Sequence, residues 1–260
     1  MNYIFYDLET NGLDYYTTGI MQISILNIKG EVLLNQYTYP YDNRIDCSHI
    51  HGIDDKKLVD NNAITTVELC ENIKQVLRKH YGREDVYFIA YNNFGYDQII
   101  LENNFKICGI KMPNNWFFID LFPIVKELHP NLKPNHKLKT VYENMFKKDD
   151  SITFHSSLDD TRCIYNIFMN IKDIYNILPK YTRPLLHSFD INSAPISALY
   201  GYHDSMQLQK KNINTIGDMY KIFQNNINFE EYIRDKYGLY SKFYINNIIK
   251  QLNIIKHLQG

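Results

Sequence analysis

Short apolar stretches separated by turn residues open the chain and recur in its middle. Asn11-Gly12 and Lys29-Gly30 are turn dipeptides that divide the first three stretches, and this arrangement predicts an antiparallel meander. Residues 86–91 form a continuous apolar run, as expected for a buried strand, and residues 116–121 are another short strand candidate. The predicted strands are residues 3–6, 20–28, 32–39, 86–91 and 116–121.

Helical spacing of apolar positions is clearest in residues 65–79. There Val67, Cys70 and Ile73 fall on one stripe, which predicts an amphipathic helix, and Thr65 or Thr66 is its expected N-cap. Further helices are expected near residues 96–103, 121–128, 137–146 and 160–177. Strands followed by alternating strands and helices predict an α/β fold, a mixed sheet with helices packed on it.

The pattern breaks at residues 178–190, which contain Pro179 and Pro184. Prolines in such a stretch indicate a boundary between structural units. We therefore expect a first domain over residues 1–178 and a small all-α domain over residues 185–260. In the second, Thr215 and Asp218 have the spacing of a capping box at a helix start.

Composition narrows the class of protein. The chain has 260 residues, of which 45% are hydrophobic and 22% charged, as in ordinary soluble globular proteins. No apolar run approaches the roughly 20 residues of a membrane span. The N-terminus lacks a basic region that would suggest secretion, and the four cysteines are scattered without a CxxC pair, which suits a reducing compartment. We expect an intracellular protein of the cytoplasm or nucleus.

Charge and residue usage add two weaker indications. Residues 1–178 contain 18 basic and 23 acidic side chains, whereas residues 179–260 contain 10 and 6. This asymmetry is typical of two units with different roles. Abundant Tyr, Ile and Asn suggest AT-rich coding, as in some large DNA viruses or parasites, in which case the host cytoplasm would be the compartment.

Three acidic motifs carry the candidate chemistry. Asp7 and Glu9 would share one face of a strand, and two such carboxylates become favourable when a divalent cation lies between them. Asp97 follows a predicted strand and opens a helix. His155 lies five residues before Asp160 at another helix start. Taken singly, each motif is better explained by solvated acids at a strand end or by helix capping.

Taken in order, the motifs resemble those of the DEDD exonuclease superfamily. The similarity is to its histidine-containing DEDDh branch, with the proofreading epsilon subunit and the three-prime repair (TREX-type) exonucleases. The matching segments are FYDLETNGL (5–13), AYNNFGYD (90–97) and HSSLDD (155–160). Ser156 stands where the tyrosine branch would need Tyr. The resemblance covers residues 1–178 and implies an RNase H-like fold, with a mixed five-stranded sheet flanked by helices.

The resemblance also implies roles for individual residues. Asp7, Glu9, Asp97 and Asp160 would hold two Mg²⁺ or Mn²⁺ ions, which activate water and stabilise the leaving 3′ oxygen. His155 would act as the general base, because histidine titrates near neutral pH. The product would be a nucleoside 5′-monophosphate.

Residues beside these motifs are candidate substrate contacts. Thr10 would lie near the terminal 3′-OH, and Leu13 and Phe94 would stack on or wedge the last bases. Phe94 is equally consistent with ordinary packing, and Asn92 is expected mainly to fix its loop. His51, in an HGI segment similar to one in the family, is expected to be mainly structural.

The sequence therefore predicts a metal-dependent 3′→5′ exonuclease acting on single-stranded 3′ ends, with DNA slightly favoured over RNA. One alternative is an exonuclease-fold subunit or binding module, docked to a polymerase or RNA-processing complex through residues 185–260. A second is an endonuclease on the same fold. The core edge or the C-terminal domain would be the surface for a protein partner or a homodimer, and no membrane partner is expected.

Overall fold

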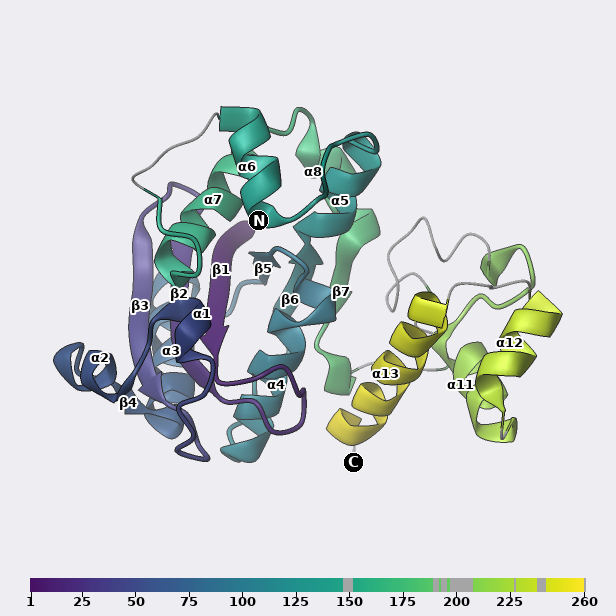
Figure 1. Ribbon diagram of the computed structural model, residues 1–260, viewed down its shortest axis with the longest axis horizontal. Coiled ribbons are helices and arrows are strands. Elements are labelled where there is room, and N and C mark those ends of the chain that lie inside the picture. The colour runs from purple at the N-terminus through teal and green to yellow at the C-terminus, as the bar shows by residue number, and fades with distance from the viewer. Residues whose placement is uncertain are drawn as a thin grey trace.

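A seven-stranded mixed sheet forms the centre of the protein in the computed structural model (Figure 1). The structure describes residues 1–146, 152–188, 192, 196, 208–226, 228–237 and 242–259. The strand order is β4-β3-β2-β1-β5-β6-β7. The strands are β1 (Asn2–Thr10), β2 (Ile20–Asn27), β3 (Val32–Tyr39), β4 (Ile64–Thr65), β5 (Val86–Ala90), β6 (Trp116–Asp120) and β7 (Thr182–Pro184). The meander of β1, β2 and β3 is antiparallel, and β5 and β6 continue the sheet parallel to β1.

The five predicted strands are confirmed, and the prediction of a five-stranded sheet needs a correction. A short strand adds to each edge: β4 pairs parallel with β3, and β7 pairs antiparallel with β6. The sequence conceals β7 because it lies inside the proline-containing stretch that predicted a boundary. Pro184 ends this edge strand. Because β7 lies at the edge, the N–H that proline lacks removes no hydrogen bond from a central strand of the sheet. The sheet therefore extends beyond residue 178.

Helices cover both faces of the sheet. They are α1 (Ser48–His51), α2 (Asp55–Asp60), α3 (Thr66–Tyr81), α4 (Asp97–Ile107), α5 (Leu121–Leu128), α6 (Leu138–Phe146), α7 (Ser157–Asn170), α8 (Ile174–Ile177), α11 (Ile216–Asn225), α12 (Phe229–Tyr237) and α13 (Lys242–Gln259). Short 3-10 helices lie at η1 (Asn93–Gly95), η2 (Leu178–Tyr181) and η3 (Leu186–Ser188). The expected N-cap of α3 is Thr65, which also forms a capping box with Glu68, and the expected capping box of α11 is present.

Two details of the helices differ from the sequence prediction. Val67, placed on the apolar stripe of α3, is 52% exposed, and Leu69 is buried in its place. The single helix expected over residues 160–177 is divided into α7 and α8. Asp173, between them, has a φ of 55°, a left-handed conformation that interrupts a helix.

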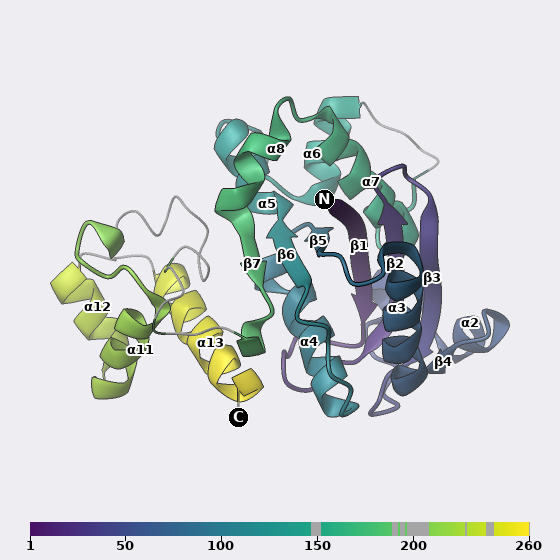
Figure 2. The ribbon, with the colours of Figure 1, turned by 180° about the vertical axis from the view of Figure 1, so that it is seen from behind.

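Alternating residues of β1 face two different cores. Ile4, Tyr6 and Leu8 pack with α3 and α4, whereas Tyr3 and Phe5 pack with α5, α6, α7 and α8. The two views in Figures 1 and 2 show these helices as layers on opposite faces of the sheet. Because side chains alternate along a strand, the next odd-numbered residues of β1, Asp7 and Glu9, fall on the face covered by α7.

The C-terminal helices lie beside α4, with α13 nearest to it (Figures 1 and 2). One apolar cluster runs from α4 into α11, α12 and α13, through residues such as Ile216, Ile248 and Leu252. The independence of residues 185–260 as a domain stays a prediction. Among the helices that the structure describes, none combines the length and apolar character needed to cross a membrane.

Candidate active site

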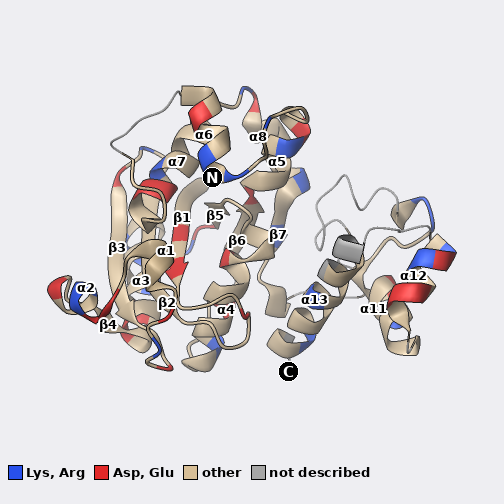
Figure 3. Ribbon diagram, in the orientation of Figure 1, with Lys and Arg blue, Asp and Glu red and all other residues tan. Residues whose placement is uncertain are grey.

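Three carboxylates from distant parts of the sequence meet at the end of β1. Ligand oxygens of Asp7, Glu9 and Asp160 all lie within 4.8 Å of one another. Asp7 and Glu9 share a face of β1, and Asp160 lies in the first turn of α7. The Ser157 hydroxyl donates to the Asp7 carbonyl at 2.7 Å, which ties the start of α7 to the strand. Figure 3 shows acidic positions on β1 near the centre of the sheet.

The Asp160 carboxylate is only half satisfied by protein donors. Its Oδ2 accepts a hydrogen bond from the His155 backbone N–H at 3.1 Å. Its Oδ1 is buried and has no hydrogen-bond partner. A buried charged oxygen without a partner is costly, and a cation bound between the three carboxylates would satisfy it. The residues present therefore fit a hard divalent cation, which prefers oxygen ligands.

Burial and mutual repulsion strongly raise the pKa values of these carboxylic acids. Burial, then the charges of Asp160 and Asp97, raises the pKa of Glu9 to about 8. Burial, followed by Asp160, Asp97 and Glu9, raises the pKa of Asp7 well above its ordinary value. Burial is also the main cause that raises the pKa of Asp160 to about 7. A cluster that resists ionisation in this way is a site that a cation would stabilise.

Asp97 is the fourth predicted ligand, and the structure places it at the first position of α4, just after β5 and η1. It is 5% exposed. Burial, then the charge of Asp120, raises the pKa of Asp97 to about 8. Its charge acts on both Asp7 and Glu9. Asp97 therefore belongs to the same electrostatic site, beside the group of three carboxylates.

Asp120 is a residue of this site that the sequence analysis did not single out. It ends β6, and its carboxylate accepts hydrogen bonds from the backbone N–H groups of Phe94 and Phe122, each at 3.0 Å. Burial raises the pKa of Asp120 to about 6. The signal available in the sequence was its place at the carboxyl end of a strand, because the carboxyl ends of parallel strands meet at one edge.

The two histidines near the site differ in exposure. His155 is exposed, and its backbone has a φ of 66°. His51 is buried: its Nδ1 accepts from the Ile53 N–H at 3.1 Å, and its Nε2 has no geometric hydrogen-bond partner. Burial lowers the pKa of His51. Of these two histidines, His155 is therefore the one that presents its side chain to solvent.

The predicted substrate contacts lie in different surroundings. The Thr10 hydroxyl contacts the Gly12 carbonyl of its own loop and the Tyr96 hydroxyl before α4, so its hydrogen bonds are used within the protein. Leu13 is 76% exposed, whereas Phe94 is 7% exposed. The Arg183 guanidinium covers the Phe94 ring at 3.9 Å. The structure therefore leaves Leu13 open to a substrate and places Phe94 in packing.

Asn92, the remaining predicted contact, is exposed and holds a left-handed conformation with a φ of 63°. Its side chain lies so close to Gly95 that a Cβ there would come within 2.5 Å of Asn92 Oδ1. Asn92 therefore shapes the loop before Asp97, as its sequence position suggested.

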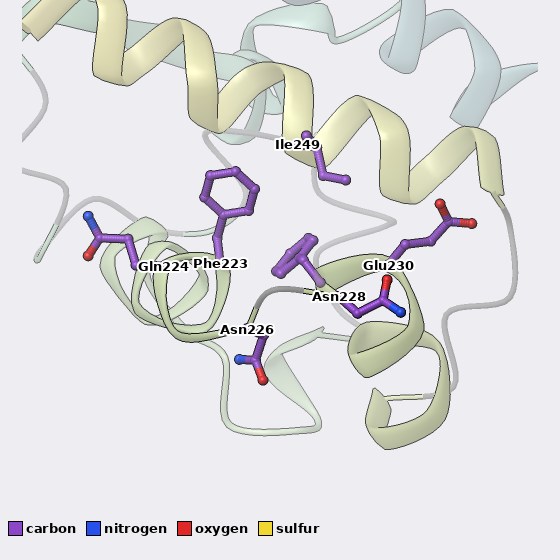
Figure 4. A pocket seen from close by; sticks show the side chains of 7 residues that line it. Phe223, Gln224, Asn226, Asn228, Glu230 and Ile249 are labelled. Carbon is purple, nitrogen blue, oxygen red and sulfur yellow. The ribbon is translucent and has the colours of Figure 1, made fainter.

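A pocket of about 460 Å³ lies away from the carboxylates, between α11, α12 and α13 (Figure 4). Among the described residues that line it, Glu230 is the one acid. The lining residues are Phe223, Gln224, Asn226, Asn228, Phe229, Glu230 and Ile249. The described lining consists mainly of aromatic and amide side chains, which do not form a set of metal ligands. In the described part of the chain, the group at Asp7, Glu9 and Asp160 is the one with metal-binding geometry.

Solved exonuclease structures share this fold. Escherichia coli exonuclease I in its zinc-bound complex with single-stranded DNA superposes with a TM-score of 0.55 at 13% identity, over 68% of this chain and 42% of that one. A full-length 3′-exonuclease gives 0.54 at 15% identity, over 68% and 84%. Cell-death related nuclease 4 gives 0.52 at 18% identity, over 68% and 64%. These identities establish similarity of fold.

The sequence comparisons identify the family. Exonuclease DPD1, chloroplastic/mitochondrial, from Arabidopsis thaliana is 27% identical over 181 residues, which cover 64% of this chain and 54% of the relative. The chain thus spans about half the length of that relative. The RNase_T exonuclease family model matches residues 4–168, the part of the chain that holds all the candidate ligands. The chain therefore belongs to the RNase_T exonuclease family.

Proposed function

We propose that this protein is a metal-dependent 3′→5′ exonuclease that releases nucleoside 5′-monophosphates from single-stranded 3′ ends, with DNA favoured over RNA. The observation that carries the proposal is the convergence of Asp7, Glu9 and Asp160 within 4.8 Å. The unpartnered Oδ1 of Asp160 supports a cation there. The family membership supports phosphodiester hydrolysis from a strand end.

The residues that would hold the metal are Asp7, Glu9, Asp97 and Asp160. Four carboxylates are a suitable oxygen set for two Mg²⁺ or Mn²⁺ ions. Bound there, such a pair supplies the positive charge that activates a water for attack and stabilises the leaving 3′ oxygen. The protein's part is to hold the carboxylates on three rigid elements, β1 and the helix starts of α4 and α7.

His155 is the proposed general base. It lies just before α7, and its own backbone N–H holds Asp160 at 3.1 Å. This hydrogen bond keeps His155 next to Asp160, so its exposed side chain can reach a water at the site. A ring nitrogen would take the proton of the attacking water, which is work suited to the pKa range of histidine.

A single strand fits the surroundings of the site. Leu13, 76% exposed on the loop after β1, offers an apolar surface to the terminal base. Three E. coli exonuclease I structures of this fold contain single-stranded DNA, a dA13 oligonucleotide or a dA16 oligonucleotide, which supports a similar ligand for this chain. The four free cysteines are consistent with a reducing compartment. We therefore propose the cytoplasm or nucleus. The plant relative is named for organelles.

The test uses 5′-labelled single-stranded DNA and RNA of one sequence with Mn²⁺, the wild-type protein and Asp7→Ala. Asp60→Ala, which removes an exposed acid at the end of α2, is the matched control. We expect a ladder that shortens from the 3′ end with wild type and Asp60→Ala and is absent with Asp7→Ala. Internal fragments would show an endonuclease, and equal rates on the two substrates would refute the preference for DNA.

A further inference from the structure

The chain changes from one helix to another just before Asp97. The 3-10 helix η1 ends at Gly95, and α4 begins at Asp97. Tyr96, between them, has φ −152° and ψ −71°, which is far from helical geometry. Carbonyls at the end of a helix lack partners in their own helix, so Phe94 and Gly95 must find donors elsewhere.

Those donors come from distant parts of the sequence. Gln251 of α13 donates from Nε2 to the Phe94 carbonyl at 2.7 Å, in a buried hydrogen bond. Arg183 of β7 donates to the same oxygen at 3.3 Å. The Gly95 carbonyl accepts from the Tyr15 hydroxyl, and the Lys250 ammonium lies 3.6 Å from the centre of the Tyr15 ring. Two consecutive residues of α13 thus support the two carbonyls.

The backbone of Phe94 is therefore held at both its N–H and its carbonyl. Its N–H donates to Asp120 of the catalytic sheet, and its carbonyl accepts from Gln251. Asp97 follows three residues later. Fixing this turn fixes the direction in which α4 begins, and with it the position of the Asp97 carboxylate.

Helix α13 is itself anchored along α4, so Gln251 has a rigid base. His257 contacts Asn103 Oδ1 at 3.1 Å, and Lys106 donates to the His257 carbonyl. Gln251 is 7% exposed, and its Oε1 is buried without a hydrogen-bond partner. A leucine would fill this space without burying an unpaired oxygen. The amide is thus useful there for its donor.

We infer that Gln251, through the Phe94 carbonyl, is a positioning residue for Asp97, and that the C-terminal helix is part of the support of the metal site. This inference rests on the proposed function, because it requires that Asp97 helps to hold the metal. It assigns to α13 a role in the nuclease centre itself, in addition to any contact that residues 185–260 make with a partner.

The test compares Gln251→Leu with Asn253→Leu, which makes the same kind of change at an exposed position of the same helix. In EDTA, we expect amide hydrogen exchange in the segment 92–97 to be faster in Gln251→Leu than in wild type and Asn253→Leu. In Mn²⁺ titrations well below the unfolding temperature, we expect the Kd of Gln251→Leu to rise about 3- to 10-fold, the size of one buried hydrogen bond. If Gln251→Leu folds poorly, Gln251→Met takes its place in the test, because methionine is a flexible side chain without a hydrogen-bond donor. We expect the same changes in exchange and Kd from it.

The outcomes separate the two ideas. If wild type binds Mn²⁺ no better than Asp7→Ala, the proposed function fails. If wild type binds Mn²⁺ and the Gln251 variants have the same Kd and the same exchange in segment 92–97, Gln251 has no positioning role. A lower unfolding temperature with unchanged Kd would show that the residue contributes packing alone, and would also overturn the inference.

Discussion

Replacing Asp160 by asparagine is expected to stabilise the metal-free protein while disabling its metal site. Asparagine keeps an oxygen to accept from the His155 N–H, as Asp160 Oδ2 does now. Its amide nitrogen would take the place of the buried, unpartnered Oδ1. This nitrogen would face the carboxylates of Asp7 and Glu9, whose oxygens lie within 4.8 Å. It could donate a hydrogen bond to them, whereas the Asp160 carboxylate repels them.

The magnitude follows from the pKa of Asp160, which burial raises from its ordinary 3.8 to about 7. At about 1.4 kcal/mol per pH unit, ionised Asp160 lowers the stability by at most about 4 kcal/mol above pH 7. Because a neighbouring carboxylate can take up a proton instead, we expect about 1–3 kcal/mol. For a chain of this size that is a rise in Tm of about 2–10 °C.

The pH dependence has a definite sign. Between about pH 4 and about pH 7, the folded state holds a proton on Asp160 that the unfolded state releases. The contribution of Asp160 to wild-type stability therefore falls over this range as pH rises, and it is constant above about pH 7. Glu9 and Asp97, whose pKa values are about 8, extend the fall to about pH 8. The advantage of Asp160→Asn should therefore be small at pH 5 and full at pH 8.

The assay is thermal unfolding in EDTA at pH 5 and pH 8. Asp159→Asn is the control, because Asp159 is the adjacent acid and is engaged by Arg162 at the surface; it should shift stability by less than about 1 kcal/mol. Saturating Mn²⁺ should reverse the order, since only wild type gains binding energy. A lower Tm for Asp160→Asn than for wild type at pH 8 in EDTA would refute the repulsion on which this reasoning depends.

Two further changes test other parts of the structure. His155→Ala should slow turnover about 10²- to 10⁴-fold with an unchanged Kd for Mn²⁺, because the side chain acts on water and not on metal; turnover equal to wild type would exclude it as the base. Gly19→Ala should destabilise the fold by about 1–3 kcal/mol, because its Cβ would meet Pro40 Cβ at 2.5 Å; an unchanged urea midpoint would contradict that clash.

The parts of the site that local pattern determines could be predicted from the sequence. Strand alternation put Asp7 and Glu9 on one face, and the structure brings them together with Asp160. The capping boxes at Thr65 and Thr215 were predictable for the same reason, since the motif and its partner lie three residues apart. The positions of the five longer strands along the chain followed from turn residues and apolar runs.

Features that depend on distant contacts could not be predicted. Phe94 had the position of a base-stacking residue, but Arg183, 89 residues later in the chain, covers its ring. The support from Gln251 spans 157 residues. Arg183 lies within the predicted boundary stretch and Gln251 lies beyond it, and no local period links either residue to Asp97. The short edge strand β7 was missed because pairing with β6, and not its own composition, makes it a strand.

The most direct test of the central claim is anomalous diffraction from crystals soaked in Mn²⁺, with Asp7→Ala crystals as the control. The account predicts two peaks about 3.5–4 Å apart between Asp7, Glu9, Asp97 and Asp160 in wild type, and their loss in the variant. Peaks elsewhere, or an empty carboxylate cluster at saturating Mn²⁺, would contradict the assignment of these four residues as the metal site.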